Sequence, residues 1–173
     1  MTSSRTRVPA LLALLAALVL LAGQPAAAAV VGDCAPATSW PQSQPDLAAE
    51  VVQLVNAHRA SRGLAPLTVT ASLTRSADWK ARHMAAFRYF AHNDQAPPAA
   101  RTVGQRLAAC GYGGGTYGEN LAYGLRTAQA VVSAWLRSSG HRANIESRAF
   151  ATIGVGVATA ANGTVYWAQN FGS

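Results

Sequence analysis

The sequence has little negative charge, a single lysine and only two cysteines. Seven acidic residues stand against fourteen basic ones in 173 residues, and the formal net charge is +7. This excess favours anionic partners. The arginines are scattered along the chain and form no continuous basic run, so no nucleic-acid partner is expected.

The sequence also lacks the short motifs of common secreted hydrolases. It contains no Gly-x-Ser-x-Gly turn, which would present a serine nucleophile, and no His-Glu-x-x-His helix, which would hold a catalytic zinc ion. Because both cysteines are expected to be oxidised, no activated nucleophile is evident. Covalent catalysis is therefore not expected.

Only one long apolar run is present, and it lies near the N-terminus. Arg5 and Arg7 precede an apolar stretch over residues 10–22. This stretch has the length of a signal-peptide core and is shorter than the roughly 20 residues that cross a bilayer. The sequence predicts a signal peptide over residues 1–29 and a secreted, extracellular protein. A membrane anchor left in place is the alternative, and no span is expected in the mature protein.

Cleavage of these 29 residues leaves 144 of the 173, a usual size for one domain. The net charge then falls from +7 to +5, because two arginines leave with the signal peptide. Residues 30–45 are rich in Pro, Ser, Thr and Gln and predict a flexible N-terminal arm. Residues 46–173 are expected to form a single domain and a monomer.

Cys34 and Cys110 are the only two cysteines of the chain. In the oxidising environment of an exported protein, such an even pair is expected to close one disulfide. Two free thiols are the alternative.

Apolar residues recur at helical spacing in four segments. The first predicted helix begins at Asp46, which is placed to cap it, and ends at Gly63. The other three cover residues 71–87, capped by Thr70, residues 103–110, and a segment from about 127 to 138.

Toward the C-terminus the period changes to two. Residues 153–158 and 165–171 alternate, and Asn162-Gly163 between them predicts a tight hairpin because both residues tolerate positive φ. Residues 119–122 are consistent with a further short strand. Helices that precede a hairpin indicate an α+β domain, in which helices cover an antiparallel or mixed sheet.

Five motifs follow one another along residues 46–172. They are Asn56-x-x-Arg59 with Gly63, Leu64 and Leu67; Phe90-Ala91-His92; Gly118-Glu119-Asn120-Leu121-Ala122; Trp135 to His141 with Arg142 and Asn144; and Tyr166 to Gly172. This order resembles that of bacterial members of the CAP superfamily, the cysteine-rich secretory proteins, antigen 5 and pathogenesis-related proteins, which share the SCP domain. The resemblance implies a three-layer α-β-α sandwich with a central, mostly antiparallel sheet and a large surface cleft.

The resemblance also implies a site in that cleft. Members place two histidines and one or two glutamates there, and the matching positions are His92, Glu119 and His141. Two neutral imidazoles are good ligands for zinc or another divalent metal, so His92 and His141 are candidate metal ligands and Glu119 is the candidate catalytic residue. The alternative is a purely structural role, in which these side chains anchor loops by hydrogen bonds.

Four other residues bear on this site. Ser138 stands where many eukaryotic members have a second cleft glutamate, so the paired acid and base of those relatives is absent. Glu146 lies nearby in sequence but matches no family position. His58 and His83 lie in predicted helices without a motif around them, and we expect them to be at the surface or half-buried.

Three functions follow as hypotheses. The first, favoured by the association of CAP proteins with sterols and lipids, is a non-enzymatic module that binds a lipid, a sterol or an anionic cell-envelope ligand in the cleft. The second is a metal-dependent hydrolase of the peptidase type, in which His92 and His141 hold the ion and Glu119 activates its water. The third is an interaction factor that binds through loops 96–101 or 111–118.

Overall fold

The computed structural model describes residues 34–98 and 100–173, so the predicted signal peptide and residues 30–33 lie outside the described residues. The described elements are α1 (Pro45–Ser61), β1 (Thr68–Val69), α2 (Ala71–Phe87), α3 (Val103–Ala109), β2 (Tyr117–Tyr123), α4 (Ala128–Arg137), α5 (Ser139–Glu146), β3 (Thr152–Thr159) and β4 (Val165–Gly172). Within this part of the chain, no helix combines the length and the apolar character that a bilayer crossing requires.

The strands form one mixed sheet in the order β1-β3-β4-β2. The β3–β4 hairpin and the β2–β4 pair are antiparallel, whereas β1 runs parallel to β3. The sheet is therefore mostly antiparallel, as predicted. The prediction missed β1, because two residues are too few to show an alternating pattern.

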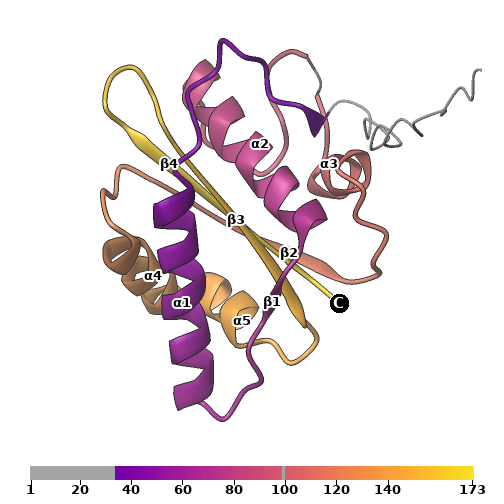
Figure 1. Cartoon of the computed structure of the whole chain (residues 1–173), viewed down its shortest axis with the longest axis vertical. Helices are drawn as coiled ribbons and strands as arrows, with labels where there is room; N and C mark the ends of the chain where they lie inside the picture. Colours follow the sequence, from indigo (N-terminus) through magenta and orange to yellow (C-terminus); the bar gives the residue numbers. More distant parts are fainter. Residues whose placement is uncertain (1–33, 99) are drawn as a thin grey trace, which may run out of the picture.

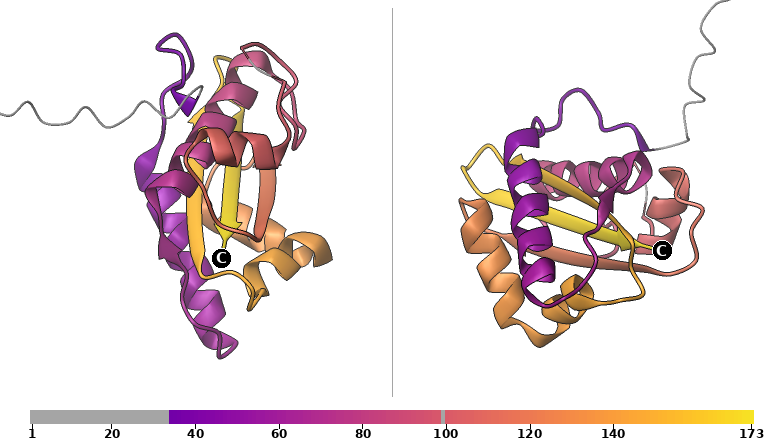
Figure 2. Two further views of the ribbon diagram at one scale, coloured as in Figure 1. Left: turned by 90° about the vertical axis from the view of Figure 1, so that its right-hand side faces the viewer. Right: turned by 60° about the horizontal axis from the view of Figure 1, so that its bottom comes forward.

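Helices cover both faces of the sheet (Figures 1 and 2). On one face, α1, α4 and α5 enclose the larger hydrophobic cluster, with Val55, Trp135 and Ile145 packed against Trp167 of β4. On the other face, α2 contributes Ala77, Ala81 and Met84 to a second cluster with Leu121 and Tyr166. The predicted three-layer α-β-α sandwich is confirmed.

Helix α2 lies directly on β3 because two glycines leave room for it. A β-carbon built on Gly154 would come within 2.1 Å of the Leu73 carbonyl carbon, and one on Gly156 within 2.3 Å of the Ala77 carbonyl carbon. Residues with side chains at these positions would push the helix off the strand. These two glycines fix the spacing between the middle layer and α2.

The ends of the first two helices differ from the prediction in detail. Helix α1 begins at Pro45 with Gln44 in the cap position, so Asp46 lies in the first turn and does not cap the helix. The stop at Gly63 is as predicted, since this residue adopts a φ of +66°. Thr70 occupies the N-cap position of α2, but its hydroxyl makes no capping hydrogen bond.

Two connections were not predicted correctly. The fourth predicted helix ends at Arg137, and a separate helix, α5, follows because Ser138 is extended between them. In the β3–β4 hairpin only Gly163 has a positive φ, and the turn is closed by a bond from the Ala160 amide to the Thr164 carbonyl. The connection is thus wider than the two-residue turn that Asn162-Gly163 indicates.

The described part of the predicted arm, residues 34–44, is packed against the domain. The predicted disulfide between Cys34 and Cys110 is present. Trp40 is buried and its ring makes an edge contact with Trp79. Farther along, the Gln44 amide donates to the carbonyl of Val157 in β3. These attachments hold the segment on the domain surface.

Candidate functional site

The structure brings two of the predicted site residues into direct contact. The Nδ1 atom of His92, in the loop after α2, lies 2.9 Å from Oε1 of Glu119 in β2. The His92 side chain is 55% exposed, whereas the Glu119 side chain is 2% exposed. An exposed imidazole is therefore oriented by a buried carboxylate.

Arg106 of α3 holds this carboxylate from the opposite side. Its Nη2 atom pairs with Oε2 of Glu119, and its Nη1 atom donates to the backbone carbonyl of His92 over 3.2 Å. Helix α3 is fixed at its start by a capping box between Thr102 and Gln105. Both oxygens of Glu119 are thus engaged, one by an arginine and one by an imidazole.

Glu119 belongs to a larger group of buried charges, which we call the buried ion cluster: Lys80, Asp94, Arg101, Arg106 and Glu119. Asp94 lies at its centre. Its Oδ1 atom accepts from Arg106 over 2.6 Å and from Lys80 over 3.1 Å, and its Oδ2 atom accepts from Arg101 over 3.2 Å. The carboxylates of Asp94 and Glu119 are bridged by Arg106, so α2, α3, β2 and the loop after α2 are joined by charge-assisted bonds.

Lys80 is fully buried within this cluster. Its ammonium group also donates to the Tyr89 hydroxyl over 3.0 Å and to the Asn93 carbonyl over 3.1 Å. Burial, followed by the neighbouring Arg106 charge, lowers the pKa of Lys80 to about 8, although Asp94 acts in the opposite direction.

His83 lies beside the cluster and is fully buried, so the expectation of a surface or half-buried position was wrong. Its Nε2 atom lies 3.1 Å and 3.0 Å from the carbonyl oxygens of Ala96 and Pro97, and its Nδ1 atom lies 2.6 Å from the Tyr89 hydroxyl. The two carbonyls accept, so Nε2 carries the proton and Nδ1 accepts from tyrosine. Burial lowers the pKa of His83 and raises the pKa of Tyr89.

His58 and Glu146 form a separate pair at the contact between α1 and α5. The Nε2 atom of His58 lies 2.8 Å from Oε1 of Glu146, and Arg62 adds a longer contact of 3.4 Å. The His58 side chain is half-buried, as expected. The hydrogen bonds to His58 and Arg62 lower the pKa of Glu146. Glu146 therefore serves this pair and does not replace the missing cleft glutamate.

His141 approaches His92 from the other face of the sheet. Successive side chains of β2 point to opposite faces, so Glu119 faces α3 while Asn120 faces α5. The Asn120 amide donates to the His141 carbonyl over 3.1 Å and accepts from Asn144 over 2.9 Å. Burial lowers the pKa of His141, and the nearby His92 lowers it further.

The donor geometry does not fit a metal centre with three protein ligands. Across residues 34–98 and 100–173, no three histidine, cysteine, aspartate or glutamate side chains gather closely enough to hold an ion. Glu119 already uses both oxygens, and the His141 side chain makes no hydrogen bond to His92 or Glu119 in the described residues. The site consists of an oriented imidazole with a second imidazole nearby.

Two exposed aromatic rings lie close to the candidate site along the chain, since Phe90 precedes His92 by two residues and Tyr123 follows Glu119 by four residues in β2. Phe90 and Tyr123 are 49% and 55% exposed, and their ring centroids lie 4.7 Å apart. Tyr166 stacks beneath Tyr123 at 6.1 Å. We call these three residues the aromatic shelf. Exposed aromatic rings next to each other are typical of surfaces that bind ligands with apolar faces.

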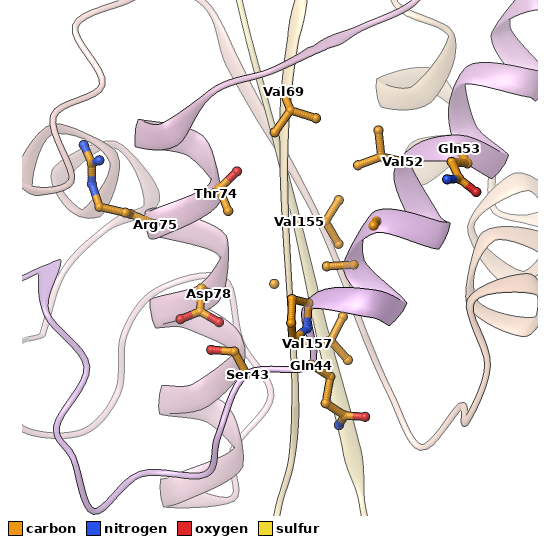
Figure 3. A pocket seen from close by; sticks show the side chains of 14 residues that line it. Ser43, Gln44, Val52, Gln53, Val69, Thr74, Arg75, Asp78, Val155 and Val157 are labelled. Atoms are coloured by element: carbon orange, nitrogen blue, oxygen red, sulfur yellow. The ribbon is translucent and has the colours of Figure 1, made fainter.

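An apolar hollow of about 620 Å³ lies at a different place, between α1 and α2 at the β1 side of β3 (Figure 3). None of the residues of the predicted site lines it.

Sequence reasoning missed the residues that hold Glu119 in place. Lys80 carried a signal, since it lies three residues after Ala77 and four before Met84, on the buried face of a helix. An ionisable residue on such a face needs a partner. Asp94 and Arg106 had no comparable signal, because their partners are set by the packing of α3.

Comparison with known proteins gives a consistent assignment. Residues 52–171 match the model of the Cysteine-rich secretory protein family, CAP. The protein YkwD of Bacillus subtilis (strain 168) is 37% identical over 134 residues, which are 78% of this chain and 50% of that protein. The chain therefore spans about half the length of this curated relative.

Two solved structures are similar in fold. An extracellular protein containing an SCP domain from Bacillus anthracis str. Ames has a TM-score of 0.66 at 27% identity, over 75% of this chain and 41% of that chain. An outer surface protein from Borrelia burgdorferi has a TM-score of 0.69 at 19% identity, over 77% of this chain and 98% of that chain, which concerns the fold alone. Since the family match covers more than half of the chain, it belongs to the cysteine-rich secretory protein (CAP) family.

Proposed function

We propose that this chain is a secreted, non-enzymatic binding module for a lipid, a sterol or another cell-envelope ligand. The binding surface comprises His92, Glu119 and His141 together with the aromatic shelf. The observation that carries the proposal is the contrast in exposure between His92, which is half-exposed, and its buried partner Glu119.

This arrangement supports binding because the exposed imidazole is held in one orientation before a ligand binds. The His92 imidazole cannot rotate freely, since Glu119 accepts at Nδ1 and is itself fixed by Arg106. With the Nδ1 proton directed at Glu119, the neutral ring leaves its Nε2 atom available to accept from a ligand hydroxyl. Phe90, two residues before His92, contacts Tyr123, and the two exposed rings supply an apolar surface for the same ligand. A polar group beside an apolar shelf suits an amphipathic ligand.

The hydrolase alternative has less support. A general base must have a free oxygen within reach of the water that it activates. Glu119 has an imidazole on one oxygen and a guanidinium on the other, so it acts as a positioning residue. Ser138 leaves the site without the second carboxylate that could take over this role.

Cosedimentation with three probes tests the proposal: phosphatidylglycerol vesicles, phosphatidylcholine vesicles containing cholesterol, and purified cell-wall sacculi. We expect the protein to sediment with at least one probe, and the Phe90→Ala and His92→Ala variants to bind it several-fold more weakly. Val69→Ala is the control, because Val69 is similarly exposed but lies in β1, at the opposite edge of the sheet from β2. The proposal fails if no probe is bound, or if the His92 and Phe90 variants bind as well as the control.

Export is part of the same proposal. The Cys34–Cys110 disulfide supports it, because such bonds persist in oxidising compartments. N-terminal sequencing of the protein from culture medium should begin at Val30, as cleavage after residue 29 requires. Recovery of full-length protein in the membrane fraction would contradict it.

A further inference from the structure

We infer a second binding site, at the open edge of β3, for the amino-terminal end of a short extended peptide. It lies at the opposite edge of the sheet from β2 and is independent of the function proposed above.

The outer edge of β3 is covered at both ends and open in the middle. At one end, the Thr70 amide donates to the Ile153 carbonyl over 3.1 Å, and at the other end the Gln44 amide donates to the Val157 carbonyl over 2.9 Å. Backbone groups alternate in direction along a strand of an antiparallel pair, so Val155 also points its N–H and C=O outward. In the part of the chain that the structure describes, neither group has a hydrogen-bond partner in another segment.

Val155 lines the apolar hollow of about 620 Å³ (Figure 3), so its two outward backbone groups border this space. Its α1 wall and its ends are largely aliphatic, from Pro45, Ala48, Ala49, Val52, Val69 and Val157. A backbone donor and acceptor beside apolar side chains is the pattern by which sheet edges bind extended peptides, since the peptide backbone supplies the missing bonds.

The length of the open edge limits the guest. Ile153 and Val157 are four residues apart, which is about 13 Å along a strand. About three guest residues fit before they meet Thr70 at one end or the 43–44 segment at the other. A full strand, including the edge of a second copy of this chain, is therefore excluded.

Charge selects the direction of the peptide. Asp78 is the one acidic residue among those that line the hollow, and its Oδ2 atom lies 3.8 Å from Nη1 of Arg82, too far for a hydrogen bond. It lies level with Gly156, whose β-carbon would touch its amide nitrogen. Arg75 is the basic residue that lines the hollow, and its guanidinium group donates to the Cys110 carbonyl over 2.8 Å. A protonated amino terminus is therefore favoured next to Asp78.

An amino terminus at Asp78 places the guest antiparallel to β3. Its first residue then lies opposite Gly156 and its second opposite Val155. In an antiparallel pair one residue can exchange both backbone bonds with its partner. The second guest residue therefore donates to the Val155 carbonyl and accepts from the Val155 amide. A parallel guest would direct its carboxylate toward Asp78.

Titration of the ¹⁵N-labelled mature protein with the tripeptide Ala-Val-Ala tests this geometry. The Val155 amide resonance should move downfield in a saturable way, since its N–H gains an acceptor. N-acetylated Ala-Val-Ala should bind about tenfold or more weakly, because it lacks the ammonium group that faces Asp78. Ala-Val-Ala N-methylated at the valine amide should also bind about tenfold or more weakly, because it cannot donate to the Val155 carbonyl.

Two variants of the protein complete the test. Asp78→Asn should bind Ala-Val-Ala about tenfold more weakly while binding the acetylated peptide unchanged. Ala49→Trp should block binding by filling the hollow, whereas Ala57→Trp, at an exposed position of the same helix outside the lining, should not. The inference is overturned if the Val155 amide does not respond, if either modified peptide binds as well as the parent, or if Ala49→Trp and Ala57→Trp bind equally. Saturable binding of decanoate in the hollow without binding of the tripeptide would also overturn it and would identify an acyl-chain site.

Discussion

Lys80 is the only lysine in the chain, and its ammonium group is fully buried. Raising the pH from 8 to 9.5 should therefore stabilise the folded protein through this one residue. Burial and the Arg106 charge lower its pKa from 10.5 in the unfolded chain to about 8 in the folded protein. Between these values the folded state binds fewer protons than the unfolded state. The free energy of unfolding then rises with pH.

The expected size follows from the two pKa values. With a folded pKa of about 8 and an unfolded value of 10.5, integration over pH 8 to 9.5 gives a gain of about 1–2 kcal/mol. The contribution is complete only above the unfolded pKa and is lost as the pH falls through the folded pKa. Burial raises the pKa of Tyr89 and Tyr166, which opposes the gain as the pH nears 10, so the range stops at 9.5.

Urea denaturation at pH 8.0, 8.5, 9.0 and 9.5 measures this change. The Lys80→Met variant is the matched control and should show a flat profile, because no other lysine titrates in this range. Asp94 retains Arg101 and Arg106 as partners in the variant. Direct titration of the Lys80 side chain by NMR should give a midpoint near pH 8.

The reasoning is refuted by either of two results. One is a wild-type profile that is flat or falls between pH 8 and 9.5 while the variant behaves in the same way. The other is an NMR midpoint near the ordinary lysine value, which would mean that the buried ion cluster fully stabilises the charged ammonium.

Three further predictions concern stability, each measured by chemical denaturation. Arg106→Met should lower the free energy of unfolding by about 3–5 kcal/mol, because it removes a buried partner from two carboxylates. Arg62→Met, at an exposed position, should lower it by less than about 1 kcal/mol. Similar losses in the two variants would contradict the assignment of a buried ion cluster. Gly156→Ala should lower the free energy of unfolding by at least about 1–3 kcal/mol, since the added β-carbon overlaps the α2 backbone. Gly140→Ala, in an open helical position, should raise it by about 0.5–1 kcal/mol. An unchanged stability of Gly156→Ala would refute the close approach of α2 to β3. Cys34→Ser should lower the unfolding free energy by about 4 kcal/mol through loss of loop closure, and an unchanged value would show that the disulfide does not restrain the unfolded chain.

Several elements could be predicted from the sequence because their signals are local. The apolar stripe of Leu73, Ala77 and Met84 recurs at helical spacing and predicted α2 to within a residue at each end. Alternation predicted β3 and β4, and the two cysteines, in a chain expected to be exported, predicted their own pairing. The family motifs brought His92 and Glu119 to attention as a pair, and the structure joins them.

Other features depended on contacts between distant residues. Strand β1 exists because it lies against β3, and α5 is held through Asn144, which bonds to Asn120 in β2. His83 was misjudged because the residues that bury it, Trp40 among them, come from other segments.

The sequence by itself determined the helical and strand periodicities, the basic charge, the disulfide partners and the residue types at the candidate site. The tertiary structure decided the partners of each charge. Lys80, Asp94, Arg106 and Glu119 are spread over 40 positions of the chain, and only the packing of α2, α3 and β2 brings them into one buried cluster. It likewise decided that the edge of β3 is open at Val155, because hydrogen bonding between strands depends on where distant segments end and is not encoded by any local pattern.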